Sequence, residues 1–351
     1  MPRDRVAPDH SVVPMAPDVS VAANDLTARP GLSLIAVLRN EIYMLPTFLE
    51  AYRKLGVARF ILLDDRSDDG SADYLAQQSD VMLLTSTRRY GDRPDEAELP
   101  PALRGKGDLR MIHLWRTALM NRFCHDRWAV QCDLDEIACL PKGTDLNTLT
   151  QAADQKGENG IWGGMIDLYP ESIDDLAPGT ATAGDPRAGT WYFDGARHFT
   201  LRKGAPPLHR YVGVRYRLDT HYGLKPKISA LRALKLKWRG RYKAPSGRLV
   251  KPLLQRWSRG NFYLSSHVTT LSLGHHQLIP LMHYRYTPAI YGKIDWAIPS
   301  GGYSKGNSDY QRFDALLSRM AADHARFTCP LSRRFTGFDD LAATGNAIGL
   351  N

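Results

Sequence analysis

The chain is poor in cysteine, with only four in 351 residues, at positions 124, 132, 139 and 329. No two of them have the C-x-x-C spacing that zinc and redox sites favour. Three of the four surround a segment interpreted below as a buried strand, where cysteine packs as a small hydrophobic residue. A chain without a disulfide framework is typical of a reducing compartment, so we expect a cytoplasmic location.

Long hydrophobic runs are also missing. The longest apolar stretches, such as Leu34–Leu38 and Phe60–Leu63, are far shorter than the roughly 20 residues needed to cross a bilayer. The first thirty residues have no apolar core of the kind found in signal peptides, and we expect residues 1–30 to form a flexible tail.

Acidic residues are scarce between Arg197 and Arg259. This segment has eighteen Lys or Arg and a single acid, Asp219, so it carries +17 in a chain whose net charge is +9. Such a segment is typical of contact with an anion, for example a nucleotide diphosphate, an anionic membrane or nucleic acid. Residues 231–239 are basic and partly amphipathic, which favours peripheral contact with the anionic inner face of a membrane.

What the chain does contain is an alternation of short apolar runs with helical patterns. Strands are expected at residues 32–38, 59–63, 81–84 and 128–132, and helices at 45–55, 72–78 and 108–124. This alternation predicts an α/β fold with a doubly wound, mostly parallel sheet. After residue 140 the pattern becomes irregular and richer in Gly and Pro, which indicates a second lobe.

Polar clusters follow three of the expected strands. They are Arg39-Asn40-Glu41, Asp64-Asp65 and Asp133-Leu134-Asp135-Glu136. In an open parallel sheet the carboxyl ends of the strands meet at one edge, where ligands bind. We therefore expect the three clusters to lie together at that edge.

The last cluster has the pattern of a metal site. Asp133 and Asp135 alternate along an extended segment, so their side chains point to the same face. Paired carboxylates suit Mn²⁺ or Mg²⁺, which fill their other positions with phosphate oxygens and water. Such an ion would neutralise a leaving diphosphate. Asp64 or Asp65 could accept hydrogen bonds from a nucleoside, although Asp68–Ser71 can also simply cap the next helix.

These motifs resemble the glycosyltransferase family 2-like group, and more narrowly its bacterial branch related to the family 92 enzymes. The likeness is carried by Val37–Glu41, Leu63–Ser71, Asp133–Glu136, Asp167–Pro170, Trp191–Asp194, Gly213–Arg217, Lys251–Leu253, Ser265–His267 and His283–Tyr284, in that order. It covers residues 32–315. It implies a GT-A fold and transfer of a sugar, with inversion, from a nucleotide-sugar to a glycan or lipid-linked acceptor.

The resemblance also implies roles for individual residues. Asn40, Glu41 and Asp65 would lie near the nucleoside, and Asp133 and Asp135 at the metal and diphosphate. His283 would be the third ligand, because GT-A enzymes often complete the site with a histidine from the C-terminal half. Residues 31–140 would then bind the nucleotide-sugar, residues 141–320 would form the acceptor-side lobe, and residues 321–351 a C-terminal extension.

Other roles rest on side-chain chemistry. Arg215 and Arg217 would share one face if residues 214–218 form a strand, and with Lys251 they are candidates for binding the diphosphate. A general base must deprotonate the acceptor hydroxyl. By analogy Asp167, with Glu171 close by, is the first candidate for that base, and Glu136 is the rival. UDP is the expected donor nucleotide. Arg66, however, stands where related sequences often have a small or amide residue, so the identity of the donor nucleobase stays open.

Two other functions are alternatives to a glycosyltransferase. A nucleotidyltransferase usually has a Gly-rich loop after its first strand, and residues 39–43 contain no glycine. A nucleic-acid-binding protein could use the basic segment, with Trp238, Tyr242 and Trp257 as stacking platforms. That function would leave the acidic edge unexplained, because carboxylates repel phosphate unless a metal intervenes. The adjacent pair His275-His276 is interpreted as structural or as part of the surface.

Overall fold

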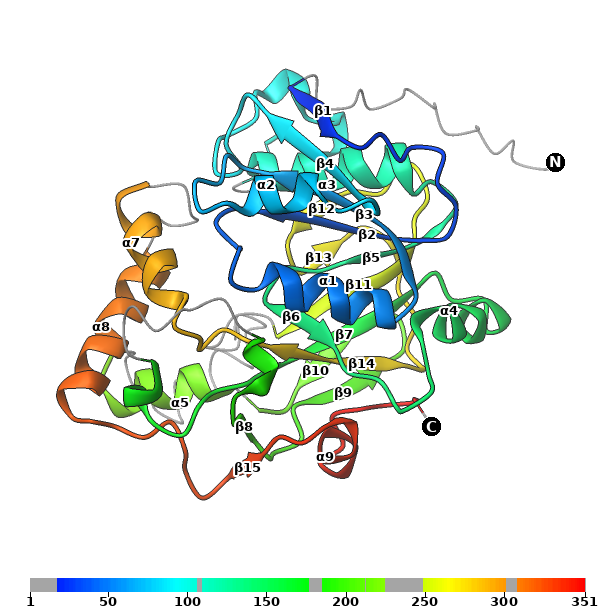
Figure 1. Ribbon diagram of the computed structural model, residues 1–351. Coiled ribbons are helices and arrows are strands. Elements are labelled where there is room, and N and C mark those ends of the chain that lie inside the picture. Colours follow the sequence, from blue (N-terminus) through cyan, green and yellow to red (C-terminus); the bar gives the residue numbers. More distant parts are fainter. Residues whose placement is uncertain are drawn as a thin grey trace.

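The computed structural model describes residues 18–105, 109–176, 185–211, 213–224, 249–300 and 308–350 (Figure 1). The strands of its main sheet are β1 (Val19–Ala23), β2 (Leu32–Leu38), β3 (Val57–Asp64), β4 (Val81–Ser86), β5 (Trp128–Gln131), β6 (Glu136–Ala138), β7 (Gly160–Asp167), β11 (Val250–Arg256) and β14 (Leu278–His283). The helices are α1 (Leu45–Lys54), α2 (Ser71–Ala76), α3 (Met111–Phe123), α4 (Leu146–Gln155), α5 (Gly213–His221), α7 (Ile290–Ser300), α8 (Ser308–Ala322) and α9 (Phe338–Ala343).

The nine strands form one mixed sheet in the order β1-β4-β3-β2-β5-β11-β7-β14-β6. Strands β2 to β5 are parallel, as the sequence predicts, and β7 and β14 are parallel to each other. Strand β11 lies between β5 and β7 and is antiparallel to both, while β1 and β6 are antiparallel edge strands. The sheet is therefore only partly parallel, because later segments enter it in the reverse direction.

Helices cover both faces of the sheet. On one face, Leu34 and Leu62 pack with residues of α1, α2 and α4, such as Phe48, Leu75 and Leu149. On the other face, the alternate residues of the same strands pack against α3. Strands β2 and β3 are buried on both faces, which explains why they read as continuous apolar runs.

A small helical region closes one end of the sheet. Helices α5, α7 and α8 gather there around their own apolar cluster, which includes Val214, Ile294 and Phe313. Figure 1 shows this region on the side toward which the arrow of β14 points. The carboxyl ends of the parallel strands therefore face the helical region.

Short strands complete the fold: β8 (Tyr192–Asp194) pairs with β15 (Ser332–Arg334), β9 (Phe199–Arg202) with β10 (Ala205–His209), and β12 (Tyr263–Ser265) with β13 (Val268–Thr269). None of the described helices is long and apolar enough to span a membrane.

Two local expectations were wrong. Residues 19–23, expected in a flexible tail, form β1, which pairs with β4 and extends the sheet. Residues 214–218, expected as a strand, belong to helix α5. The basic amphipathic stretch 231–239, with Trp238, and Tyr242 lie outside the described residues.

Candidate functional site

A cavity of about 220 Å³ lies at the carboxyl ends of β2 and β5. Its walls include Asn40 and Glu41, which follow β2, and Asp133 and Asp135, which follow β5. Two of the three polar clusters predicted from the sequence therefore meet in one cavity. The geometric reason is that β2 and β5 are adjacent and parallel, so their chain exits lie side by side.

The loop after β3 is joined to the loop after β2 by the side chain of Asn40. Its Nδ2 donates to Asp68 Oδ1 at 2.8 Å, and its Oδ1 accepts from the backbone N–H of Asp68 at 2.9 Å. The backbone N–H of Asn40 donates to Ser67 Oγ at 2.8 Å. Asn40 has a φ of 54°, a left-handed conformation that asparagine tolerates better than most residues. Asn40 thus lines the cavity while it holds the two loops together.

Asp64 and Asp65 have different environments. Asp64 accepts from the backbone N–H of Ser67 at 3.0 Å and from the Ser67 hydroxyl, so its carboxylate stabilises the turn after β3. Asp65 is 1% exposed, and its nearest cation is the guanidinium of Arg89, at 3.9 Å. Burial raises the pKa of Asp65 to about 6, against the opposing effect of the Tyr90 backbone and Arg89. Neither Asp64 nor Asp65 is among the residues that line the cavity.

Asp65 leads to a prediction on stability. Its folded pKa of about 6 lies above the ordinary value of 3.8. The folded state therefore binds the proton more tightly, and stability falls as the pH rises from about 4 to about 6. We expect Asp65→Asn to be more stable than the wild type by about 1 kcal/mol at pH 8, with no gain below about pH 4. Urea unfolding at both pH values measures the difference, and an equal gain at both would contradict the assignment.

Asp133 is held by two cations. Its Oδ1 accepts from Arg116 Nη2 at 2.5 Å, and its Oδ2 accepts from Lys251 Nζ at 2.5 Å. Burial opposes its ionisation, but Lys251 and Arg116 hold the pKa of Asp133 well below its usual range. Asp133 is therefore a permanent anion, and Arg116 and Lys251 fix the orientation of its carboxylate.

Lys251 lies beneath the carboxylates rather than in the cavity. Its side chain is fully buried, and Nζ also donates to Glu136 Oε2 at 2.7 Å. The same Glu136 oxygen accepts from the backbone N–H of Asp133 at 2.9 Å. Lys251, predicted to bind the diphosphate, instead bridges Asp133 and Glu136, because β11 enters the sheet directly beside β5.

His283 brings Asp135 and Asp167 together. Its Nδ1 lies 2.6 Å from Asp167 Oδ1, and its Nε2 lies 3.7 Å from Asp135 Oδ2. Although burial disfavours the charged ring, Asp135 and Asp167 raise the pKa of His283 to about 9. Asp167, predicted as the general base, is turned toward this ring and is not among the residues that line the cavity. It lines a separate small pocket with Asp194 and His198.

Three oxygen and nitrogen atoms are placed to share one cation. Ligand atoms of Asp135, Glu136 and His283 all lie within 4.8 Å of one another. A histidine that ligates a metal usually donates its other ring N–H to a carboxylate, which fixes the tautomer. Asp167 is in the position to accept that hydrogen bond from His283 Nδ1. Of the three ligands predicted, Asp135 and His283 belong to this group, while Glu136 takes the place of Asp133.

The cavity also contains two cations that the sequence analysis missed. Lys293, on α7, lies 2.8 Å from Glu41 Oε1 and 3.5 Å from Asp135 Oδ2. Burial raises the pKa of Glu41 to about 7, against the attraction of Lys293. Arg116, on α3, is 1% exposed, and its Nε and Nη1 have no hydrogen-bond partner among the described residues. The available signal for Arg116 was its position on α3 beside Trp115 and three residues before Leu119, two apolar residues that are buried.

Charge in the ion-pair network does not balance. The network joins five carboxylates, those of Glu41, Asp133, Asp135, Glu136 and Asp167, to three permanent cations, Arg116, Lys251 and Lys293. His283 is a fourth cation while its ring is protonated, as its raised pKa of about 9 implies, so the excess is then one negative charge. The excess becomes two when the ring is neutral, which is the form that ligates a divalent cation. The donor set, two carboxylates and one imidazole, suits such an ion.

Arg215 and Arg217 lie elsewhere. Both are on helix α5, where residues two apart point in nearly opposite directions. Arg215 donates to Asp219 and lies over the ring of Phe313 at 4.2 Å. Arg217 pairs with Asp194 at 3.1 Å. The prediction that both bind the diphosphate is not supported by these positions, since neither lines the cavity.

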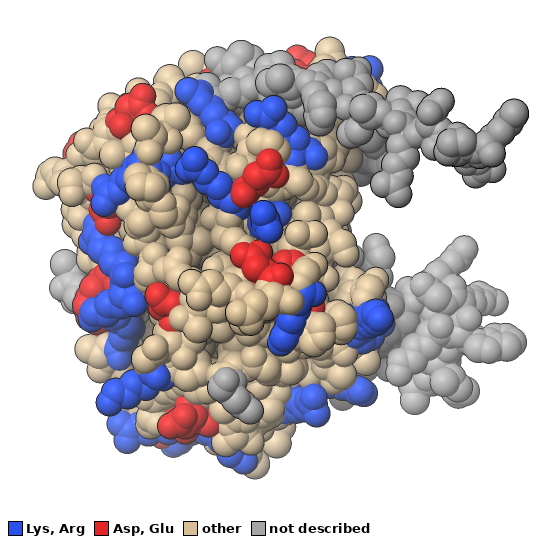
Figure 2. Space-filling model, turned by 90° about the vertical axis from the view of Figure 1, so that its right-hand side faces the viewer, with Lys and Arg blue, Asp and Glu red and all other residues tan. Residues whose placement is uncertain are grey.

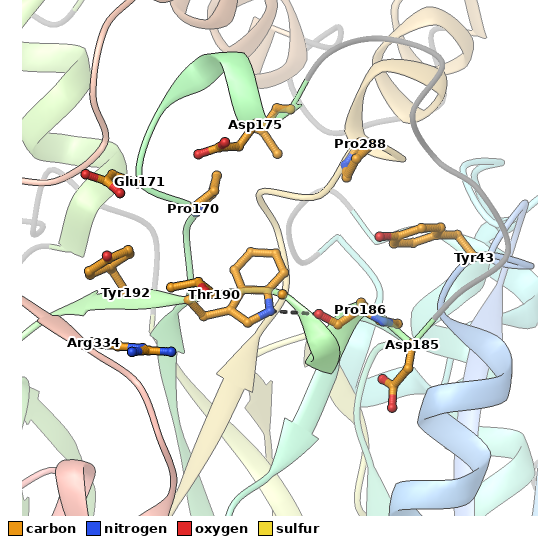
Figure 3. Close-up of a pocket in the computed structure, with 13 residues that line it drawn as sticks. Tyr43, Pro170, Glu171, Asp175, Asp185, Pro186, Thr190, Tyr192, Pro288 and Arg334 are labelled. Atoms are coloured by element: carbon orange, nitrogen blue, oxygen red, sulfur yellow. Dashed lines mark hydrogen bonds between the residues drawn. The ribbon is translucent and has the colours of Figure 1, made fainter.

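A second, larger cavity of about 750 Å³ lies farther along the same edge (Figure 3). Aromatic rings and carboxylates line it: Tyr43, Trp191, Tyr192, Glu171, Asp175 and Asp185. Trp191 is fixed there, because its indole N–H donates to the carbonyl of Pro186 at 2.7 Å. Glu171 accepts a hydrogen bond from Arg326.

The two cavities are connected through neighbouring residues. Tyr43 lines the larger cavity two residues after Glu41 of the smaller one. The rings of Trp191 and Tyr284 meet edge to face at 5.2 Å, and the Tyr284 backbone N–H donates to the Asp135 carbonyl at 2.8 Å. Trp191 of the larger cavity is therefore linked to Asp135 by contacts that run through Tyr284.

A nucleic-acid interface was predicted to use the basic segment 197–259. Figure 2 shows one face of the molecule, on which Lys and Arg side chains are interspersed with Asp and Glu. Of the basic segment 197–259, residues 225–248 lie outside the described part of the chain. Trp257, expected as a stacking platform, is fully buried and stacks on Tyr263 at 5.3 Å.

No protein-family model matches the chain, and no curated protein matches it either.

Proposed function

We propose that this protein is a metal-dependent glycosyltransferase that moves a sugar, with inversion, from a UDP-sugar to a hydroxyl of a glycan or lipid-linked acceptor. The observation that carries the proposal is the group Asp135, Glu136 and His283, whose ligand atoms lie within 4.8 Å of one another beside a cavity. A mixed sheet with its polar clusters at the carboxyl edge is compatible with the GT-A fold that the resemblance implies.

We assign the donor nucleotide to the smaller cavity. The rings of Tyr90 and Trp296, whose centroids are 5.8 Å apart, line it and offer apolar faces to a base. Arg116 presents guanidinium N–H groups that no described residue accepts, and a diphosphate oxygen is a strong acceptor for them. Arg116 replaces Arg215 and Arg217 as the proposed diphosphate ligand.

Mn²⁺ or Mg²⁺ held by Asp135, Glu136 and His283 would act as a Lewis acid that neutralises the leaving diphosphate. Asp167 orients the ring of His283 through a hydrogen bond with His283 Nδ1. Lys251 pairs with Asp133 and Glu136 and fixes both carboxylates. Because an imidazole is among the ligands, we expect Mn²⁺ to bind more tightly than Mg²⁺. In this proposal Asp167 positions His283 and Glu136 is a metal ligand, and neither is the general base.

The acceptor fits the larger cavity. Sugar rings stack on aromatic faces, and their hydroxyls donate to carboxylates, which Tyr43, Trp191 and Glu171 supply. The general base is expected among the carboxylates of this cavity, with Glu171, already marked by the sequence, as the first candidate.

Calorimetric titration of the protein with UDP, with and without Mn²⁺, tests the proposal. We expect UDP to bind only when Mn²⁺ is present, and GDP and CDP to bind more weakly. UDP-sugars that bind are then tested for slow hydrolysis, which needs no knowledge of the acceptor. Failure of UDP, GDP and CDP to bind under the same conditions would remove the donor site and the function with it.

A further inference from the structure

A second group of metal-ligating side chains lies at the opposite edge of the sheet. Glu158 lies two residues before the start of β7, and His275 and His276 come just before β14. Strands β7 and β14 are parallel neighbours, so their amino-terminal ends lie side by side. The proposed catalytic site is at the carboxyl ends of the same strands, one at Asp167 and the other at His283. The two sites are thus separated by the length of the strands.

The three side chains already converge on one oxygen. Nδ1 of His276 lies 2.5 Å from Glu158 Oε1, and Nδ1 of His275 lies 3.5 Å from the same atom. The backbone N–H of His275 also donates to it, at 2.8 Å. The two imidazole rings lie close together, with their centroids 4.2 Å apart.

The carboxylate of this group is buried, while its two imidazole rings are partly exposed to solvent. The side chain of Glu158 is only 7% exposed, whereas those of His275 and His276 are 33% and 44% exposed. Solvent can therefore reach the ring nitrogens while the carboxylate is anchored inside. The second oxygen of Glu158, Oε2, is buried and has no hydrogen-bond partner among the described residues. A buried carboxylate oxygen without a partner is costly, which a nearby cation would offset.

Gly274 makes room for this carboxylate. A Cβ at position 274 would lie 2.1 Å from Glu158 Oε2, so no other residue fits without displacing the acid. The backbone N–H of Gly274 donates to the carbonyl of Gly160, which fixes the turn against the start of β7. The position of the Glu158 carboxylate therefore depends on the backbone of this turn, and not only on the flexible side chains around it.

We propose that Glu158, His275 and His276 bind a divalent transition metal ion, Zn²⁺ above all, through Oε1 and the two Nδ1 atoms. Water would complete a tetrahedral shell. Two imidazoles and one carboxylate are a common zinc donor set, with bonds of about 2.0–2.2 Å. Ligand atoms in such a shell lie about 3.3 Å apart, so the 2.5 Å contact to His276 would open. His276 would bind the metal as a neutral ring with its proton on Nε2. The proton on Nδ1 therefore moves to Nε2 by exchange with solvent, or is released to solvent when both nitrogens are protonated.

The metal ion would hold together the amino-terminal ends of β7 and β14 and the last described residues of the chain. Gln277, next to His276, donates to the Gly349 carbonyl at 3.3 Å, and Leu278 forms a bridge with Ile348. Glu158 is attached to the start of β7. The role is therefore stabilisation, and it does not depend on the proposed glycosyltransferase function.

The test uses Co²⁺ as a spectroscopic probe and Zn²⁺ in calorimetry, on full-length, chelator-treated, tag-free protein. An Asp135→Asn background removes binding at the other site. We expect one tetrahedral Co²⁺ per chain, with intense visible absorption, and a Zn²⁺ affinity that falls by about 10-fold or more in Glu158→Gln or His276→Ala. The double variant His275→Ala/His276→Ala should bind no Zn²⁺ at the site. Saturating Zn²⁺ should raise the Tm of the background protein and leave that of the double variant unchanged.

His324→Ala is the matched control, because His324 also lies beside a carboxylate, Asp174 at 3.1 Å, but has no second histidine there. It should retain both the Co²⁺ spectrum and the Zn²⁺ affinity. The proposal is overturned if the Asp135→Asn protein binds no Zn²⁺, or if the double-histidine variant binds it as tightly as its parent. Tm values measured without metal show whether each variant is folded.

Discussion

Replacing Asp135 with Asn is expected to abolish Mn²⁺-dependent binding of UDP and to lower sugar transfer by roughly 100-fold or more. Asp135 is the carboxylate that faces both His283 and Lys293, at 3.7 and 3.5 Å. Asparagine has the same shape but no charge, so it can neither hold the metal nor balance these cations. Calorimetry with UDP and Mn²⁺, and release of UDP from the donor, measure the two effects.

The matched control is Asp73→Asn. Asp73 is exposed in the first turn of α2, and the substitution makes the same chemical change away from the cavity. We expect it to bind UDP like the wild type. If Asp135→Asn is folded and still binds UDP only when Mn²⁺ is present, the metal is not held by Asp135 and the proposed site is wrong.

Replacing Lys251 with Met is expected to lower the free energy of unfolding by about 3–5 kcal/mol. The ammonium group is fully buried between Asp133 and Glu136, at 2.5 and 2.7 Å. Methionine fills much of the same space but leaves the buried carboxylate of Glu136 without this partner. Asp133, whose side chain is 37% exposed, also loses Lys251 but keeps Arg116. Removing one partner of a buried ion pair leaves an uncompensated charge, which costs far more than the pair contributes. Urea unfolding followed by circular dichroism measures the loss.

Two further variants test the cause. In the double variant Lys251→Met/Glu136→Gln one of the orphaned charges is gone, so part of the lost stability should return. Lys54→Met removes an exposed lysine that pairs with Glu50 on α1, and it should change stability by less than about 1 kcal/mol. If Lys251→Met lowers the free energy of unfolding no more than Lys54→Met does, then Lys251 does not stabilise the carboxylates as proposed.

The first half of the fold was readable from the sequence because its signals are local. Strands β2, β3, β4 and β5 are short apolar runs, and the helices between them repeat apolar residues at helical spacing. Chain direction then follows from the alternation of strands and helices. The meeting of Glu41 with Asp135 at one edge could be predicted for the same reason.

The second half was not readable because its order depends on contacts distant in sequence. Strand β11 inserts between β5 and β7 in the reverse direction, and no local pattern specifies that position. Residues 214–218 alternate like a strand but form a helix, because their apolar side chains pack against α7 and α8. Tertiary packing commonly overrides such short local preferences.

The sequence by itself determined which polar residues meet at the carboxyl edge of the sheet, namely Glu41 and the Asp133–Glu136 cluster, while His283 was predicted only through the resemblance. Only the tertiary structure decided what each of them faces. It turned Asp167 onto His283, placed Lys251 beneath Asp133, and brought in Arg116 and Lys293 from distant helices. It also joined His275 and His276 to Glu158, more than a hundred positions away. The physical reason is that charge and coordination depend on distance in space, which a local sequence pattern does not specify.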